Sequence, residues 1–249
     1  MIDLSIIYYT SNFLEDTNPY FLSNTKKQLS KAIGNLSLIV VSHKPVAKFN
    51  EGEYTNIVVG DIGRSHLNIY SQILTGCNAS KTAYVAMAED DILYSQDHFH
   101  SEQIEKQIKD DAFLYDMNKV SLFTWTKPSM FSFRSKRRVV NQLICNRQLL
   151  IDSMEERFKR VEELKLQGRS VESIIKYWGD PGRYENLLGV TPRKADEFYC
   201  NQPSIVFTHP DAYGYLNHGK RKRLGDIRII ELYDWGRADQ ILKLWKKDV

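Results

Sequence analysis

The chain has 249 residues, of which 42% are hydrophobic and 26% are charged, and its net charge is only +3. This composition is that of an ordinary soluble globular protein and excludes a chain that is disordered on composition grounds. The length fits one large domain, 1–249, with a sizeable core. The small net charge gives no indication of nucleic-acid binding by itself.

The apolar runs are too short to cross a bilayer, which needs about 20 residues; Leu36–Val41 is among the longest of them. The N-terminus, Met1–Leu4, lacks the pattern of a signal peptide, so we expect a cytoplasmic protein. Cys77, Cys145 and Cys200 are widely spaced. This spacing favours free structural thiols over disulfides or a thiolate zinc site.

Strands and helices are predicted to alternate through about residue 91. Apolar runs predict the strands, and apolar residues at helical spacing predict the helices. The predicted elements are a strand at Leu4–Tyr9 ending in the polar turn Thr10–Asn12, a helix from about Asn24 to Gly34, strands at Leu36–Val41 and Ile57–Val59, a helix carrying Leu67, Tyr70, Ile73 and Leu74, and a strand that begins at Ala83. This alternation predicts right-handed βαβ units, a parallel sheet and the α/β class.

The second half is predicted to mix strands and helices. Its predicted elements are strands at Val120–Trp125 and Val139–Cys145, a helix carrying Met154, Phe158, Val161 and Leu164 and stopping at Gly168, a short helix from Ser170 to near Trp178, strands at Ser204–Phe207 and Ile227–Leu232, and a last helix carrying Ile241, Leu242 and Trp245. Between them, the turn-forming segment Trp178–Glu185 carries two acids and an arginine and is a candidate site loop.

Three consecutive carboxylates, Glu89, Asp90 and Asp91, follow the apolar run that begins at Ala83. A buried parallel strand would deliver them to the carboxyl edge of the sheet, where open α/β sheets bind their ligands. Adjacent carboxylates repel one another, and a hard cation such as Mg²⁺ or Mn²⁺ relieves that repulsion. The alternative is a solvated acidic turn before a helix.

Three segments together carry a family pattern: the strand Leu4–Tyr9 with its polar end, Gly63–Asn68, and Tyr84–Asp91, whose last three residues match a variant of an Asp-x-Asp motif. In order and spacing they resemble the A-type (GT-A) fold of nucleotide-sugar-dependent glycosyltransferases. The resemblance implies a Rossmann-like α/β fold with a mostly parallel central sheet flanked by helices and a mixed C-terminal acceptor region. About 1–125 would bind the nucleotide sugar, and about 126–249 would bind the acceptor and carry a lid.

The resemblance also implies a nucleoside-diphosphate-sugar donor whose phosphates are bridged by Mn²⁺ or Mg²⁺. Asp91 and Glu89 would bind the ion, and Asp90 would lie near the sugar or ribose. A late histidine completes the metal site in many of these enzymes, and His209 and His218 are the candidates here. Either histidine is equally explained as a side chain satisfied within the fold by a neighbouring carbonyl. The ion would act as a Lewis acid toward the diphosphate leaving group.

Further donor contacts are expected from polar and basic side chains. The candidates are Thr10, Ser11, Asn12, Arg64, Lys220, Arg221 and Arg223. The last three belong to a basic run that would cover the diphosphate as a lid or contact a polyanionic acceptor, because guanidinium groups match phosphate oxygens. The first three equally suit a plain turn, and the arginine that follows them equally suits a helix surface.

Transfer with inversion needs a general base within hydrogen-bond reach of the acceptor hydroxyl. Asp180 and Glu185, in the site loop, are the candidates for this catalytic role. An acid beside Arg183 also suits a structural ion pair.

The acceptor-binding candidates are Lys136, Arg137, Arg138 and Arg183. Basic residues suit an anionic acceptor, including a hydroxymethylated pyrimidine in DNA, as in the phage-type DNA glucosyltransferases; the base would then leave the duplex to react. The rival acceptor is a bacterial surface saccharide or its lipid-linked precursor. Two other classes remain: a sugar nucleotidyltransferase, which needs a glycine-rich loop where Thr10–Leu14 has no glycine, and a non-catalytic nucleic-acid-binding module.

Overall fold

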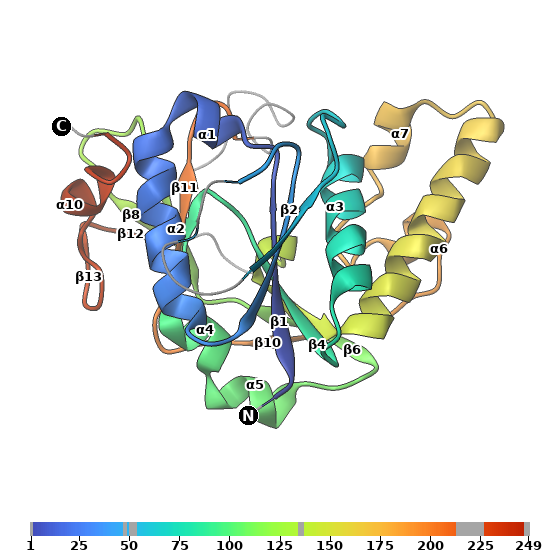
Figure 1. The fold of residues 1–249 in the computed structure, drawn as a ribbon, viewed down its shortest axis with the longest axis horizontal. Helices are drawn as coiled ribbons and strands as arrows, with labels where there is room; N and C mark the ends of the chain where they lie inside the picture. Colours follow the sequence, from blue (N-terminus) through green and yellow to red (C-terminus); the bar gives the residue numbers. More distant parts are fainter. Residues whose placement is uncertain (1, 47–48, 50–53, 134–136, 213–226, 247–249) are drawn as a thin grey trace.

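A seven-stranded sheet forms the centre of the computed structural model, which describes residues 2–46, 49, 54–133, 137–212 and 227–246 (Figure 1). The order of its strands is β10-β6-β9-β4-β1-β2-β3. Their bounds are β1 Leu4–Thr10, β2 Ser37–Ser42, β3 Tyr54–Val58, β4 Tyr84–Ala88, β6 Ala112–Asp116, β9 Leu143–Asn146 and β10 Lys194–Phe198. Only β9 is antiparallel to its neighbours, so the sheet is mostly parallel, as the sequence predicts.

The central strand β1 is buried along its whole length. Ile7 and Tyr9 belong to one core cluster, whereas Ile6 and Tyr8 belong to the other. Because successive side chains of a strand point to opposite faces, the two clusters lie on the two faces of the sheet. The apolar sequence of β1 therefore follows from its position between two layers.

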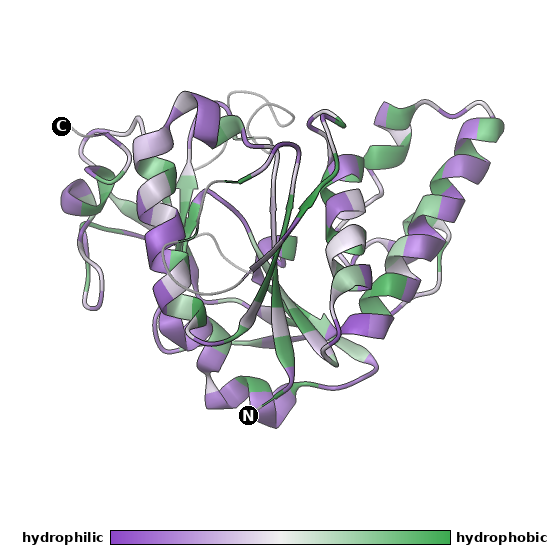
Figure 2. Ribbon diagram, in the orientation of Figure 1, coloured by the Kyte–Doolittle hydropathy of each residue, from purple (hydrophilic) through white to green (hydrophobic). Residues whose placement is uncertain are grey.

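Helices cover both faces of this sheet (Figure 1). α3 (His66–Ala79) and α6 (Arg147–Leu166) lie on one face, and α2 (Pro19–Ile33) and α4 (Gln96–His100) lie on the other. Bands of hydrophobic and hydrophilic residues alternate along these helices, as helices that bury one side require (Figure 2). The expected α/β class is confirmed.

α3 packs close to the sheet because of one glycine. A Cβ atom at Gly76 would collide with the side chain of Ile7 and lie 3.3 Å from Val41 Cγ2. The helix starts at Ser65, whose Oγ accepts a hydrogen bond from the Asn68 N–H at 3.1 Å. This cap fixes where the first turn of α3 begins, beside the ends of β1 and β4.

A second sheet, ordered β12-β8-β7-β11-β5, stands beside the first. Its strands are β5 Ile92–Leu93, β7 Lys119–Phe123, β8 Phe131–Phe133, β11 Ser204–Thr208 and β12 Ile227–Ile229. Val120, Leu122 and Phe207 pack on one face with residues of α2 and of α10 (Ala238–Leu242). The alternate residues Lys119 and Ser121 therefore face the other way.

The remaining elements are short. They are α1 Phe13–Thr17, α5 Glu102–Gln107, a 3₁₀ turn at Val140–Gln142, α7 Val171–Ile175, α8 Glu185–Leu188, β13 Glu231–Leu232 and β14 Gly236–Arg237.

Several predicted boundaries were wrong. The helix expected from Asn24 begins at Pro19, because the Asn18 side chain caps it by accepting from the Phe21 N–H. The strand expected at Val139–Cys145 starts as a 3₁₀ turn, because the Val140 N–H donates to Asp180 instead of to a neighbouring strand.

Two further differences concern the second half. The strand expected at Ile227–Leu232 is two short strands that pair with different partners, β8 and β14. Several elements were not predicted from the sequence, among them α4, α5, β6, β8 and β10. β10 is an edge strand with the polar sequence Lys-Ala-Asp-Glu-Phe, so it lacks the apolar run that marks a buried strand.

No helix within the described ranges has both the length and the apolar character needed to cross a membrane.

Candidate active site

A cavity of about 290 Å³ opens where the carboxyl ends of β1 and β4 meet the second sheet. Both halves of the chain, before and after residue 125, contribute to its lining. The polar residues that line it are Tyr9, Thr10, Ser11, Arg64, Ser65, His66, Tyr70, Gln72, Glu89, Asp90, Asp91, Lys119, Ser121, Arg137, Asn141, Asp180 and His209. The acid-ended strand thus delivers its carboxylates to a pocket, as predicted from the sequence.

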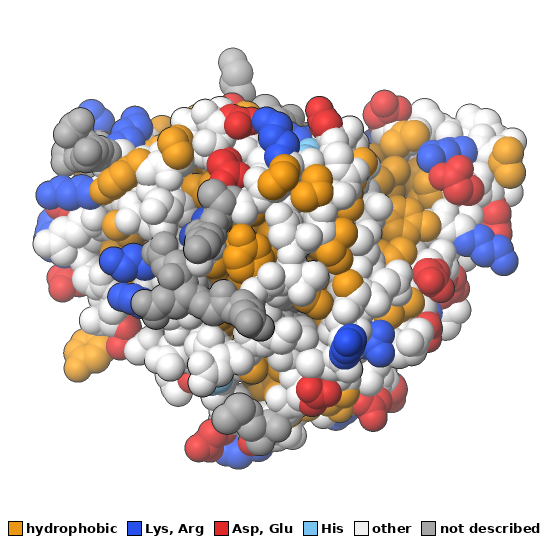
Figure 3. All heavy atoms as spheres, in the orientation of Figure 1, with side chains coloured by type: hydrophobic (Ala, Val, Ile, Leu, Met, Phe, Trp, Pro, Cys, Tyr) orange, Lys and Arg blue, Asp and Glu red, His pale blue; other side chains and the backbone are white. Residues whose placement is uncertain are grey.

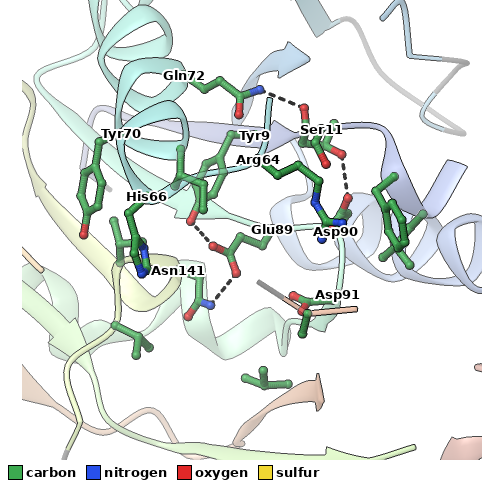
Figure 4. A pocket seen from close by; sticks show the side chains of 18 of the residues that line it. Tyr9, Ser11, Arg64, His66, Tyr70, Gln72, Glu89, Asp90, Asp91 and Asn141 are labelled. Carbon is green, nitrogen blue, oxygen red and sulfur yellow. Dashed lines mark hydrogen bonds between the residues drawn. The ribbon is translucent and has the colours of Figure 1, made fainter. Parts of the chain in front are cut away.

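Glu89 is held on both carboxylate oxygens (Figure 4). Tyr9 Oη donates to Oε1 at 2.6 Å, and Asn141 Nδ2 donates to Oε2 at 2.7 Å. The Glu89 N–H donates to Tyr94 Oη at 3.1 Å. Burial raises the pKa of Glu89, while the hydrogen bonds from Asn141 and Tyr9 act in the opposite direction. Glu89 is therefore held at both carboxylate oxygens and at its backbone N–H.

Asp90 lies at the end of the pocket formed by the loop after β1. Thr10 Oγ1 donates to its Oδ2 at 2.6 Å. Burial raises the pKa of Asp90, whereas this hydrogen bond and the positive charge of Arg64 lower it. Arg64 lies across the ring of Phe13 at 4.1 Å and donates to the Asp211 carbonyl at 2.7 Å. The pocket thus has one end where a cation, a hydroxyl and a carboxylate converge.

The three residues predicted to contact the donor in the turn after β1 lie in different places. Thr10 and Ser11 line the pocket. Asn12 is buried beneath it, with a positive φ of 59°, and its side chain links the Lys44 backbone to Glu15. Gln72 of α3 donates to the carbonyls of Thr10 and Val41, at 2.9 and 3.1 Å, and so fixes the ends of β1 and β2.

Asp91 lies next to His209, with 3.9 Å between Asp91 Oδ2 and His209 Nε2. Two ligands of an octahedral ion at about 2.1 Å are about 3.0 Å apart when adjacent and about 4.2 Å apart when opposite. The separation of 3.9 Å lies between these two values, so one ion could bind both side chains after a small movement of either one. No group of three His, Cys, Asp or Glu side chains in the described part of the chain forms a ready metal site. A carboxylate and an imidazole are ligand types that Mn²⁺ or Mg²⁺ can accept, and the remaining ligands would have to come from other groups.

Asp180, a predicted base, lines the opposite part of the pocket. Its Oδ1 accepts from the Val140 N–H at 3.0 Å and from Tyr70 Oη at 3.3 Å. Burial raises the pKa of Asp180, and the positive charge of Arg137 is the largest opposing effect. A carboxyl group whose pKa rises toward neutrality is a better proton acceptor for a hydroxyl group.

Glu185, the other predicted base, does not line the pocket. Its Oε1 lies 2.8 Å from Arg157 Nη2, and both side chains are buried. Arg157 also donates to the Trp178 carbonyl. This ion pair ties α6 to the loop that carries Asp180, so Glu185 supports the loop.

The basic candidates lie in different places. Arg137 lines the pocket, whereas Arg138 pairs with Glu197 at 2.9 Å. Arg183 stacks on Tyr184 and lies 3.7 Å from Asp180. The predicted Lys136, His218, Lys220, Arg221 and Arg223 lie outside the described residues.

Some pocket residues were not predicted from the sequence, among them Tyr9, Asn141 and Lys119. Tyr9 was predicted only as part of a strand, and the alternation of β1 gives no sign that its hydroxyl meets Glu89. Lys119 directly precedes the predicted strand at Val120. The available signal was the spacing of Lys119 and Ser121. Side chains two residues apart on a strand share a face, so this spacing indicates a polar face.

No known family matches the chain, and no curated protein matches it. Solved structures that resemble it include a nucleotidyl transferase from Methanothermobacter thermautotroptrophicus, with 13% identity, a TM-score of 0.41, and coverage of 80% of this chain and 88% of that one. The galactosyltransferase LgtC in complex with donor and acceptor sugar analogs has 9% identity and a TM-score of 0.43, over 78% and 72% of the two chains.

Residues 1–349 of S. aureus TarS in complex with UDP-GlcNAc have 10% identity and a TM-score of 0.46, over 85% of this chain and 62% of that one. This chain therefore spans less than two thirds of the TarS fragment. TM-scores below 0.5 assign no family, so a function has to be inferred from the residues of the pocket.

Proposed function

We propose that this chain is a glycosyltransferase of the A-type fold, which moves a sugar from a nucleoside diphosphate to an acceptor hydroxyl. The observation that carries the proposal is the pocket at the end of β4, where Glu89, Asp90 and Asp91 gather with a separate half-buried carboxylate, Asp180. Clustered acids at a strand end suit a cation and a diphosphate, and the fourth acid suits a general base.

The donor occupies the end of the pocket formed by Thr10, Ser11, Arg64 and Asp90 in this proposal. Arg64 neutralises phosphate charge, and Asp90 binds a hydroxyl of the sugar or ribose. The predicted basic residues Lys220, Arg221 and Arg223 cover the diphosphate.

Asp91 and His209, with Glu89 behind them, are the residues that would hold Mn²⁺ or Mg²⁺, with His218 as the other histidine candidate. Asp91 and His209 are close enough to share an ion. When bound, the ion neutralises the negative charge that develops on the leaving diphosphate.

Asp180 takes the proton of the acceptor hydroxyl. The hydroxyl oxygen forms a bond to the anomeric carbon, the bond from that carbon to the diphosphate oxygen breaks, and its electron pair leaves with the nucleoside diphosphate. The Val140 N–H and Tyr70 Oη donate to Oδ1 of Asp180, whereas Oδ2 accepts no hydrogen bond from them and lies 3.7 Å from Arg183 Nη1. In this proposal Oδ2 accepts the proton. Burial suits this role because it raises the pKa of the carboxyl group.

The acceptor in this proposal is a hydroxymethylated pyrimidine in DNA, with Lys136, Arg137, Arg138 and Arg183 as phosphate contacts. Arg137 supports it most directly, because Arg137 lines the pocket beside Asp180. Charges of both signs are mixed over the face in Figure 3, so phosphate contacts would be local to the pocket mouth. Transfer to such DNA should fall steeply with salt and after Arg137→Ala. Salt-independent transfer would leave a surface saccharide or its lipid-linked precursor as the acceptor.

A thermal-shift panel tests the donor class, because a ligand that binds the native state raises its melting temperature. Nucleoside diphosphates, nucleoside triphosphates and nucleotide sugars are compared with and without Mn²⁺. We expect one nucleotide sugar to stabilise the protein in a Mn²⁺-dependent way and Asp91→Asn to remove that dependence. Asp234→Asn, at an exposed position outside the pocket, is the matched control.

Stabilisation by triphosphates in place of nucleotide sugars would indicate a nucleotidyltransferase. An Asp91→Asn protein that binds and turns over the donor as the wild type does would refute the metal site.

A further inference from the structure

A buried lysine, Lys119, lines the pocket and is not one of the residues assigned to the donor. Lys119 is the first residue of β7, and its side chain points with that of Ser121 into the pocket, because Val120 and Leu122 occupy the opposite, apolar face. Only 9% of Lys119 is exposed. A lysine is rarely buried to this extent unless a partner compensates its charge.

The Lys119 ammonium has no such partner within the described part of the chain. Its Nζ is buried and makes no hydrogen bond there, and the Oδ1 atom of Asn141 in the same pocket is likewise without a donor. An ammonium group has three N–H donors, and leaving them unused in a buried site costs free energy. Such a group is tolerated where a ligand supplies the missing acceptors.

The charged groups near Lys119 include Asp180, which lines the part of the pocket opposite the donor end. We call this part the acceptor end. The charges that act on Lys119 most strongly are Asp116, Asp180, Glu197 and Arg137. Neither Arg64 nor Asp90, at the donor end, is among them. Loss of hydration lowers the pKa of Lys119 to about 8, although all three acids act to raise it. The nearby carboxylates therefore do not replace a directly bound counter-ion.

We propose that Lys119, assisted by Arg137, binds an oxyanion carried by the acceptor. This inference rests on the proposed glycosyl transfer and specifies its acceptor class: a hydroxyl compound with a phosphate or carboxylate group a short distance from the reacting oxygen. Lys119, Arg137 and Asp180 line the same pocket, and their charges act on one another. An oxyanion bound by the two cations would therefore bring its molecule near the base. Ser121, on the same face of β7, provides a hydroxyl donor to the same group.

The experiment measures the binding of two simple probes, inorganic phosphate and acetate, by calorimetry. An Arg64→Met background removes the cation of the donor end, so that phosphate reports on the acceptor end. Lys119→Met is then added, and Lys81→Met, at an exposed lysine outside the pocket, is the matched charge control. We expect Lys119→Met to weaken binding about 10- to 100-fold, the effect of losing one hydrogen bond to a charged group, and Lys81→Met to have none.

Tighter binding of phosphate than of acetate would identify a phosphorylated acceptor, and the reverse order would identify a carboxylate. The binding of the nucleotide sugar is measured separately with Arg64 intact. If the nucleotide sugar binds and Lys119→Met leaves the affinity for both probes unchanged, the oxyanion site is wrong and the glycosyltransferase proposal stands. If no nucleotide binds but both probes still depend on Lys119, the oxyanion site stands and the donor proposal fails.

Discussion

Tyr9 Oη lies 2.6 Å from Glu89 Oε1, and this hydrogen bond joins the ends of two adjacent parallel strands, β1 and β4. Tyr9 is buried and Glu89 is half-buried, and Asn141 donates to the other oxygen of the carboxylate. Glu89 is thus part of the framework of the pocket as well as part of the acidic motif. Its two neighbours in the chain, Asp90 and Asp91, are the residues left to interact with a ligand.

Tyr9→Phe should lower the free energy of unfolding by about 1–3 kcal/mol, because it removes a hydrogen-bond donor from the half-buried carboxylate of Glu89. Urea denaturation measures the change. Tyr84→Phe is the matched control, since Tyr84 donates to Asp110 at 2.9 Å in an exposed setting and should cost no more than about 0.5 kcal/mol. Equal losses in the two variants would contradict the framework role of Tyr9.

Asp180→Asn should lower kcat by about 10²- to 10⁴-fold while the dissociation constant of the donor stays unchanged, because a general base is removed. The fold should persist, since the amide oxygen can accept the hydrogen bond from the Val140 N–H. Steady-state kinetics and direct donor binding separate the two effects. A variant with normal kcat would exclude Asp180 as the base.

Glu185→Gln should behave in the opposite way and lower stability by about 3–5 kcal/mol, because it leaves the fully buried Arg157 without its counter-ion. Glu163→Gln is the control, since its pair with Arg160 is partly exposed and should be worth less than about 1 kcal/mol. Urea denaturation compares the variants. A Glu185→Gln protein that is as stable as the wild type but has impaired catalysis would make Glu185 a candidate general base again.

Lys119→Met should stabilise the protein near neutral pH, because the pKa of Lys119 falls to about 8 on folding from about 10.4 in the unfolded chain. Below the folded-state pKa, Lys119 is protonated in both the folded and the unfolded protein. The free-energy cost of burying its charge is then fully present. Between the two values the unfolded chain binds more protons, so wild-type stability rises with pH relative to the variant.

The advantage of Lys119→Met should therefore be about 3 kcal/mol at pH 7 and should vanish toward pH 10.5. Urea denaturation across this pH range checks it. A difference between the two proteins that does not change with pH would mean that the buried ammonium is not its cause.

The sequence was sufficient for the parts of the fold that repeat a simple pattern. The apolar runs of β1, β2 and β4 and the stripe of α3 are long and regular, so their class and order were predicted correctly. β10 was missed because it lies at the edge of its sheet and carries few apolar residues. Only Phe198 of β10 is buried, so neither an apolar run nor an alternation of apolar and polar residues marks this strand.

The candidate site was predictable where neighbours in the chain carry the chemistry, as in Glu89–Asp91, and less so where distant segments meet. Asp180 and Glu185 lie only five residues apart in the chain, yet Asp180 lines the pocket and Glu185 pairs with Arg157. That difference arises from the contact of Glu185 with Arg157 of α6 and of Asp180 with Val140, which are 28 and 40 residues away in the chain. Single-sequence patterns do not encode such contacts.

The Gln72 side chain, which donates to the carbonyls of both Thr10 and Val41, has a consequence for ligand binding. The backbone at this rim of the pocket has its hydrogen bonds before any ligand arrives, so a ligand does not have to order it. Less conformational entropy is then lost on association, and more of the contact energy appears as affinity. The amide of one glutamine thereby prepares the donor end of the pocket in advance.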